Sequence, residues 1–240
     1  MLSSLYRWYV LAAIGVTLVC WCRVARTDTR LIWIYLGGLG GAFFGAKIVY
    51  FLAEGWMDLN QHDAAIRLLT GKSILGALAG GYAGVELAKN VIRYPHTTGD
   101  WFALMAPMGI ALGRIGCLSY GCCLGAICKP GRLALLDSCG QPRWPAVPVE
   151  IAFNLLMLIV FGLMRQRRLL ATQHFHIYLM TYGIFRFGHE MVRETPHWIG
   201  PFSGYQLAAL MIVLMGAVLF RKRAVERLKN ARQNRVENRV

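Results

Sequence analysis

Charged residues are scarce in this 240-residue sequence: Asp, Glu, Lys and Arg make up 16% of it, against 56% hydrophobic residues. An average soluble domain has about a quarter of its residues charged. The sequence also lacks internal repeats and long linkers rich in Ser or Pro. With a mean hydropathy of +0.44, this composition excludes an ordinary soluble domain and favours a polytopic membrane protein.

Seven apolar segments are each about long enough to cross a bilayer, so the predicted fold is an all-α polytopic membrane protein with about seven transmembrane helices. The segments are residues 5–22, 31–52, 74–88, 99–118, 147–164, 175–192 and 205–220. No small-residue cleavage site clearly follows the first, which favours a retained helix over a cleaved signal peptide. We expect one transmembrane domain over residues 1–220 and a basic tail over 221–240.

The net charge of +14 is unevenly distributed. The tail after Phe220 holds many basic residues: Arg221, Lys222, Arg223, Arg227, Lys229, Arg232, Arg235 and Arg239. If the tail is cytoplasmic, alternation of the seven segments places most other basic loop residues on the same side, as the positive-inside rule requires. This predicts an N-terminus outside, a cytoplasmic C-terminus and a tail that contacts anionic lipid, and it disfavours the alternative, nucleic-acid binding.

Five of the seven cysteines lie in or next to the longest loop, which this topology places outside: Cys117, Cys122, Cys123, Cys128 and Cys139. Zinc sites usually use two close Cys or Cys/His pairs, a pattern that is missing, so no metal is expected. A Cys128–Cys139 disulfide is the favoured interpretation in an oxidising compartment. A nucleophilic or redox-active thiol at Cys122 or Cys123, and inert thiols, remain alternatives.

Several charged residues fall inside or at the ends of the apolar segments. Lys47, Glu86, Arg114 and Glu150 do so singly, whereas the sixth segment holds a group: Arg186, His189, Glu190 and Arg193. Their spacing of i, i+3, i+4 and i+7 places this group on one helical face, at the level of Arg114 and Glu150. Two interpretations follow: buried ion pairs, or a pocket for a phospholipid headgroup, since arginine binds phosphate with two parallel hydrogen bonds.

Several sequence blocks resemble the prolipoprotein diacylglyceryl transferase family in order and spacing, over nearly the whole chain except the tail. The most specific block is Gly113-Arg114-Ile115-Gly116. The others are Arg7-Trp8-Tyr9, Gly45-Ala46-Lys47-Ile48-Val49-Tyr50, Gly71-Lys72-Ser73 before Gly76, Arg143-Trp144-Pro145 before Glu150, Arg186-Phe187-Gly188-His189-Glu190 and Ser203-Gly204-Tyr205-Gln206.

The resemblance implies transfer of diacylglycerol from phosphatidylglycerol to the lipobox cysteine of a prolipoprotein, with release of glycerol phosphate, at the outer face of a bacterial inner membrane. It implies no cofactor and no metal. Arg114, with Gly113 and Gly116, is expected to bind the phospholipid headgroup together with Arg186. The expected catalytic residues are Arg186, Glu190, His189, Glu150 and Tyr9.

The chain departs from the family pattern at positions that concern the acceptor. Leu75 stands where the family has a histidine, and Cys117, Tyr120 and Cys122 replace two asparagines and a glutamate. A base for the acceptor thiol must then come from elsewhere, and His189 and Glu190 are the candidates. These losses keep open an alternative function, a non-catalytic or transporting membrane protein that binds phospholipid on the same scaffold.

Overall fold

The computed structural model describes residues 2–60, 62–200 and 202–237 and is mostly helical. The long helices are α1 (Leu2–Val24), α2 (Arg30–Tyr50), α4 (Ile74–Val91), α5 (Gly99–Tyr120), α6 (Ala146–Gln166), α7 (His174–His189) and α8 (Gly204–Glu237). The short helical elements are η1 (Ala25–Thr27), the π-helical turn η2 (Phe51–Gly55), η3 (Met57–Asn60), α3 (Ala64–Thr70) and η4 (Glu190–Val192).

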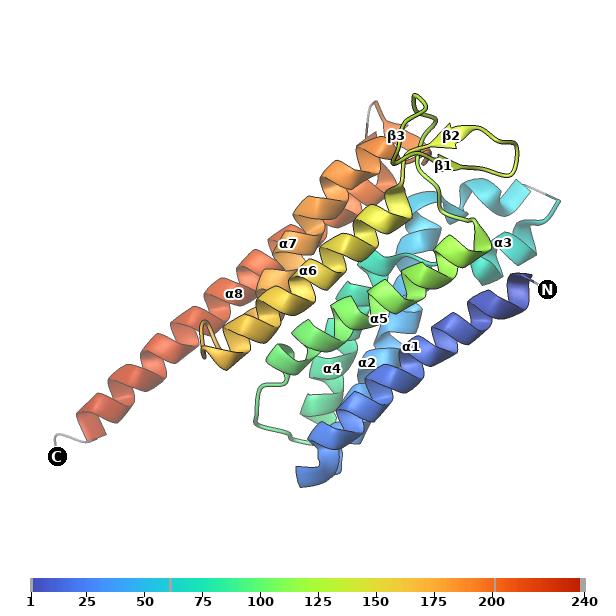
Figure 1. The fold of residues 1–240 in the computed structure, drawn as a ribbon. Coiled ribbons are helices and arrows are strands. Elements are labelled where there is room, and N and C mark those ends of the chain that lie inside the picture. Colours follow the sequence, from blue (N-terminus) through green and yellow to red (C-terminus); the bar gives the residue numbers. More distant parts are fainter. Residues whose placement is uncertain (1, 61, 201, 238–240) are drawn as a thin grey trace.

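Two small antiparallel hairpins complete the fold. One pairs β1 (Leu135–Leu136) with β2 (Pro142–Arg143), and the other pairs β3 (His197–Ile199) with β4 (Phe202–Ser203). The long helices form one bundle, and α3 and the strands lie at the end of the bundle where α1 begins (Figure 1). We call this end the loop end. The last part of α8 extends past the other helices at the opposite end (Figure 1).

Helices α2 and α4 are held together by direct contact of their backbones. Both carry glycines at every fourth position: Gly37, Gly41 and Gly45 on α2, and Gly76, Gly80 and Gly84 on α4. A Cβ atom built on Gly80 would lie 2.2 Å from the carbonyl oxygen of Gly41, far inside van der Waals contact. This close approach therefore requires glycine, as in small-residue seams between membrane helices. We call this contact the glycine seam.

Two groups of buried apolar side chains form the core. One surrounds Phe161, Tyr178 and Tyr182 and lies among α4, α5, α6, α7 and α8. The other surrounds Trp21 and Tyr35 and joins α1 and α2 to α4 and α5. The indole N–H of Trp21 donates to the carbonyl of Leu31 at 2.6 Å, so this buried polar atom has a partner.

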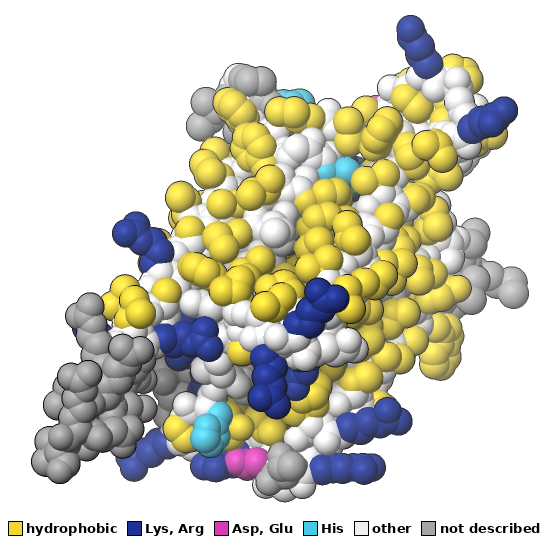
Figure 2. Space-filling view, turned by 60° about the vertical axis from the view of Figure 1, so that its left-hand side comes forward, with side chains coloured by type: hydrophobic (Ala, Val, Ile, Leu, Met, Phe, Trp, Pro, Cys, Tyr) yellow, Lys and Arg dark blue, Asp and Glu magenta, His cyan; other side chains and the backbone are white. Residues whose placement is uncertain are grey.

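The outer surface of the bundle is itself apolar. Large hydrophobic side chains stand exposed on several helices, including Trp33 and Phe44 on α2, Ile184 on α7 and Val218 on α8. Figure 2 shows hydrophobic side chains over much of one face, with many Lys and Arg side chains gathered toward one end. Exposed apolar area of this extent indicates contact with lipid.

Helices occupy all seven segments that the sequence analysis predicted. Among the described residues, four regions are long and apolar enough to cross a bilayer on length and composition alone. They are Arg30–Gly55, Gly99–Tyr120, Ala146–Gln166 and Gly204–Lys229, and Trp8–Val24 is a shorter apolar helix. Helix α7 has 16 residues and carries Arg186 and three histidines, so its composition alone does not mark it as a span. Helix α8 runs unbroken through Phe220, and the predicted tail continues it as helix to Glu237.

Candidate functional site

Glu150 is the centre of a buried charged cluster in which α5, α6 and α7 meet. It lies in the first turns of α6 and is fully buried. One of its carboxylate oxygens, Oε2, is 2.9 Å from Nη2 of Arg114 and 3.9 Å from Nη1 of Arg186. The other, Oε1, accepts a hydrogen bond of 2.7 Å from the hydroxyl of Tyr182. Both guanidinium groups are thus fixed on one carboxylate, which offsets the cost of burying these charges.

The polar face of α7 continues the cluster toward the loop end. Nη2 of Arg186 donates to Oε2 of Glu190 at 2.6 Å, and Nη1 lies 3.3 Å from Nδ1 of His189. All three side chains are more than nine-tenths buried. Arg193 follows α7 and η4 on extended backbone, with its Nε 3.8 Å from the same oxygen of Glu190. The predicted convergence of these four residues with Arg114 and Glu150 is what the structure shows.

The cluster carries more positive charge than its own acids balance. Three guanidinium groups face two carboxylates, Glu150 and Glu190. Apart from Glu150 Oε2, which is ion-paired, several buried atoms have no hydrogen-bond partner among the described residues: Arg114 Nε, Arg186 Nε, Arg193 Nε and Nη1, His189 Nε2 and Glu190 Oε1. Most of these are donors, and unpaired buried donors are costly, so the arrangement favours an anionic ligand.

The sequence analysis missed two polar residues, Asn154 and Tyr178, that hold the backbone of Glu150 in place. The hydroxyl of Tyr178 donates to Oδ1 of Asn154 at 2.7 Å, and Nδ2 of Asn154 donates to the carbonyl of Glu150 at 2.8 Å. Tyr178, Tyr182 and Arg186 are spaced by four residues, so the helical periodicity that identified the charged group extends to these tyrosines. That spacing is the sequence feature that could have identified Tyr178 and Tyr182 as part of the site.

Glu54 is a second residue that the sequence analysis did not select. It lies in the π-helical turn after α2 and accepts a hydrogen bond of 2.8 Å from the hydroxyl of Tyr205 on α8. An acidic residue at the end of an apolar run was the signal in the sequence. The bond joins the end of α2 to the start of α8, on the same side of the bundle as the charged cluster.

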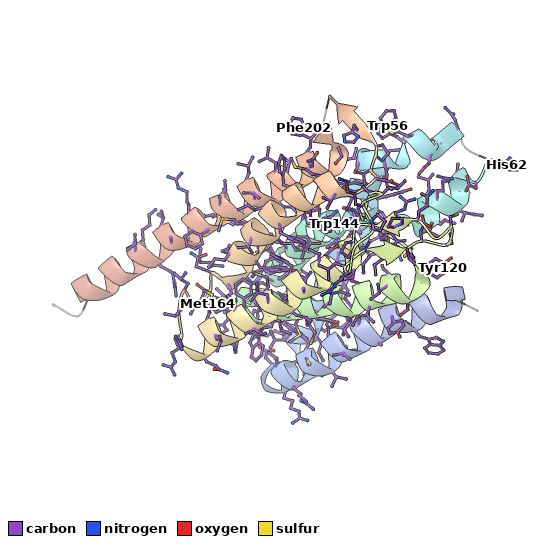
Figure 3. The ribbon with its side chains drawn as sticks, turned by 45° about the horizontal axis from the view of Figure 1, so that its top comes forward. Trp56, His62, Tyr120, Trp144, Met164 and Phe202 are labelled. Atoms are coloured by element: carbon purple, nitrogen blue, oxygen red, sulfur yellow. The ribbon has the colours of Figure 1, made fainter. Side chains whose placement is uncertain are left out.

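Three cysteines lie next to Arg114. Cys117 is buried on the last turn of α5, and its sulfur is 3.9 Å from Nη1 of Arg114. The sulfurs of Cys117, Cys122 and Cys123 all lie within 4.8 Å of one another. We call these residues the thiol triad. Figure 3 shows this end of the bundle, with Tyr120 at the end of α5 and Trp144 just before α6.

The Cys128–Cys139 disulfide is not formed, because all seven cysteines are free thiols. The backbone of Cys128 pairs with Pro142 on β2, whereas Cys139 is exposed in the turn between β1 and β2. Asp137 fixes that turn by accepting hydrogen bonds from the backbone N–H groups of Cys139 and Gln141. The turn needs no covalent bridge to close.

The remaining predicted residues lie outside the charged cluster. Tyr9 is half-buried on α1, and within the described residues it makes no hydrogen bond to the cluster. Gly116 is buried on α5, and Gly113 borders an open space. Lys47 instead stabilises α3, since its ammonium donates to the carbonyls of Leu68, Leu69 and Gly71 at 2.5–2.9 Å.

The open space beside Gly113 belongs to an apolar cavity of about 330 Å³. Its walls come from α1, α2, α4, α5 and α7, and they include Ile14, Leu39, Leu78 and Phe102. Gly113 directly precedes Arg114, but among the described residues no member of the charged cluster lines the cavity, whose walls extend to Lys89 and Arg223. The cavity and the charged cluster therefore meet only along α5, between Gly113 and Arg114.

A model of the prolipoprotein diacylglyceryl transferase family matches residues 3–221. The chain belongs to this family. A Dehalococcoides mccartyi protein named phosphatidylglycerol–prolipoprotein diacylglyceryl transferase is 28% identical over 251 residues, covering 96% of this chain and 93% of that protein. A Pasteurella multocida protein of the same name is 27% identical over 237 residues, covering 89% and 86%. A Clostridium perfringens protein, transferase 2 of that name, is 29% identical over 191 residues, covering 73% and 72%.

The family match confirms the resemblance inferred from the sequence blocks, and with it a membrane-embedded transferase. Leu75, which the sequence analysis set against a family histidine, lies in the core. Leu75 is almost fully buried and packs in the same core group as Tyr178 and Tyr182. An apolar side chain in that place cannot accept a proton, so any base must be one of the residues of the charged cluster.

Proposed function

We propose that this protein transfers the diacylglyceryl group of phosphatidylglycerol to the lipobox cysteine of a prolipoprotein and releases glycerol phosphate. The observation that carries the proposal is the buried cluster of Arg114, Glu150 and Arg186, which has surplus positive charge and unpaired donors. The names of the related proteins agree with this activity.

In this proposal Arg114 and Arg186 hold the phosphate of the donor, and Glu150 keeps both guanidinium groups in position. The acceptor thiolate attacks the glyceryl carbon of the diacylglycerol group, and the carbon–oxygen bond to phosphate breaks. The bonding electrons leave with glycerol phosphate, whose growing negative charge is stabilised by the fixed guanidinium groups. Gly113 and Gly116 leave room for the lipid on this face of α5, and the apolar cavity receives acyl chains.

The proton of the acceptor thiol needs a base, and His189 is the better placed of the two candidates. Oε2 of Glu190 is already bound by Arg186 and approached by Arg193. Nδ1 of His189 accepts from Nη1 of Arg186, so Nε2, which has no partner among the described residues, carries the ring proton in this state. Binding of the donor phosphate to Arg186 would free Nδ1, and the imidazole could then take the thiol proton. We therefore assign the base to His189 and assign Glu190 to holding Arg186. Among the described residues, Tyr9 makes no hydrogen bond to the cluster, and it stays a predicted catalytic residue that would contact the substrate once the substrate is bound.

We infer seven membrane-spanning helices in a bacterial cytoplasmic membrane, with the N-terminus and the charged cluster toward the outer face. The basic residues that follow Phe220 support this orientation, because they lie at the opposite end of α8 from Ser203 and the charged cluster. The residues after 220 form a basic cytoplasmic extension of the transmembrane domain. Partners are phosphatidylglycerol, the signal-peptide region of a prolipoprotein and the bilayer, with no role for nucleic acid.

The test is turnover by purified protein supplied with phosphatidylglycerol and a lipobox peptide, measured as released glycerol phosphate. Arg114→Lys should lower kcat/KM by roughly 10²–10³, because an ammonium cannot reproduce the two-pronged contact with phosphate. Arg132→Lys, an exposed change in the loop after α5, is the control and should leave turnover unchanged. Equal loss in both variants, or no loss in either, contradicts the headgroup assignment.

A second candidate function, phospholipid binding without transfer, is favoured by the burial of Leu75 where the family has a histidine. The two functions differ in a cell depleted of its own diacylglyceryl transferase. Growth restored by this chain, and lost again with His189→Ala, supports transfer. Saturable phosphatidylglycerol binding by purified protein that never releases glycerol phosphate supports the second candidate.

A further inference from the structure

The thiol triad is brought together by the local backbone at the end of α5. Gly121 ends the helix in the left-handed conformation, with φ of 71°. Cys123 also has a positive φ, 60°, which is uncommon for a residue with a side chain. The N–H of Cys122 donates to the carbonyl of Cys117 at 3.1 Å. The chain thus turns back at once and returns two thiols to the last turn of the helix.

The separation of the three sulfurs is close to that of a metal–thiolate site. Zinc–sulfur bonds are about 2.3 Å long, so two sulfurs on one tetrahedral ion lie about 3.8 Å apart. The triad sulfurs lie within 4.8 Å of one another, and small side-chain rotations cover the difference. The sequence analysis discounted a metal because paired Cys-x-x-Cys motifs are missing, but here one turn supplies all three sulfurs.

A positive charge lies beside the triad. Nη1 of Arg114 is 3.9 Å from the sulfur of Cys117, so negative charge on bound thiolates has a cationic neighbour. Three thiolates around a divalent ion carry a net charge of −1. The charged cluster next to them has a surplus of positive charge, so its field stabilises such a complex. Cys123 is exposed and gives an ion a path of entry.

We propose that Cys117, Cys122 and Cys123 form a binding site for a thiophilic d¹⁰ metal ion, Zn²⁺ or Cu⁺, beside Arg114. Both ions accept thiolate ligands, and three sulfurs leave a position open for water on Zn²⁺ or complete a trigonal site for Cu⁺. The site is independent of the proposed transferase reaction, which needs no metal. A disulfide between two triad cysteines is the competing outcome, because it uses the same sulfurs.

The experiment uses the full-length protein, purified in detergent without oxygen, reduced with a phosphine and freed of metal by a chelator. Zn²⁺ and Cu⁺ are then titrated separately, with bound metal measured by mass spectrometry. Co²⁺ serves as a coloured probe for thiolate coordination. We expect one ion per chain and a cobalt spectrum with sulfur-to-metal charge transfer.

Variants locate the site. Cys122→Ser and Cys123→Ser, both outside the helix, should each weaken metal binding by at least about tenfold. Cys128→Ser and Cys139→Ser, in the same loop but outside the triad, are matched controls and should bind like the unchanged protein. Thermal unfolding of each variant confirms that it is folded. The proposal is overturned by no stoichiometric binding to reduced protein, by equal binding in all four variants, or by a triad disulfide in protein isolated without reductant.

Discussion

Replacing Glu150 by glutamine removes the negative charge on which two buried arginines depend. The shape of the side chain is almost unchanged, and its amide oxygen still accepts from Tyr182. Arg114 and Arg186, however, are left as neighbouring buried cations with Glu190 as the remaining buried acid. Breaking a buried ion pair on one side typically costs about 3–5 kcal/mol. We expect a loss of stability of this order, seen as a large fall in the melting temperature in detergent.

Addition of phosphatidylglycerol should then raise the melting temperature of Glu150→Gln by more than that of the unchanged protein, because an anion replaces the missing charge. Turnover should still fall by roughly 10²–10³, since the guanidinium groups are no longer fixed for the leaving phosphate. Glu194→Gln is the control: this half-exposed carboxylate pairs with Arg143 near the surface, and its loss should cost at most about 1 kcal/mol. Equal melting temperatures for Glu150→Gln and the unchanged protein would refute the reasoning.

Three further perturbations test the supporting structure. Gly80→Leu should prevent assembly of the glycine seam and abolish folded protein on gel filtration, whereas Gly162→Leu, on α6 where a Cβ meets nothing within 4 Å, should leave the yield unchanged. The backbone N–H of Gln141 and the side chain of Arg143 lower the pKa of Asp137 below its usual 3.8. The stability that this carboxylate adds to the β1–β2 turn is therefore present above pH 3.8 and is lost as the pH falls through the lowered value. Hydrogen exchange of the turn amides should accelerate there, and Asp137→Asn should remove the pH dependence. Lys47→Met should leave three carbonyls at the end of α3 without their donor and raise hydrogen exchange in α3 alone; unchanged exchange would contradict the capping role.

The helices and the charged face were predictable because both depend on spacing within a single segment. The apolar runs located all seven long helices, and the spacing from Arg186 to Glu190 located one buried face. The glycine seam was also visible as two four-residue repeats, but their pairing was not, since it depends on which helices become neighbours. For the same reason the sequence did not join Glu54 to Tyr205.

The cysteines show where spacing along the chain misleads. Cys128 and Cys139 looked like a pair because both lie in one loop, yet the hairpin points Cys139 into solvent. Cys117, Cys122 and Cys123 looked unlike a ligand set, yet a left-handed residue after α5 brings their sulfurs together. Both outcomes depend on backbone dihedral angles in a turn, which residue types alone constrain weakly.

The length of α8 sets how deep the charged cluster lies in the bilayer. From Gly204 to Phe220 the helix rises about 25 Å, close to the thickness of the hydrocarbon core, and basic residues begin immediately afterwards. At its other end, the side chain of Gln206 donates to the carbonyl of Phe187 on α7, one residue after Arg186. In the proposed orientation, with the basic end of α8 among the lipid headgroups of one leaflet, α8 holds Arg186 near the headgroups of the opposite leaflet. Inserting or deleting one helical turn between these points would move the arginines by about 5 Å relative to the phosphate they are proposed to bind.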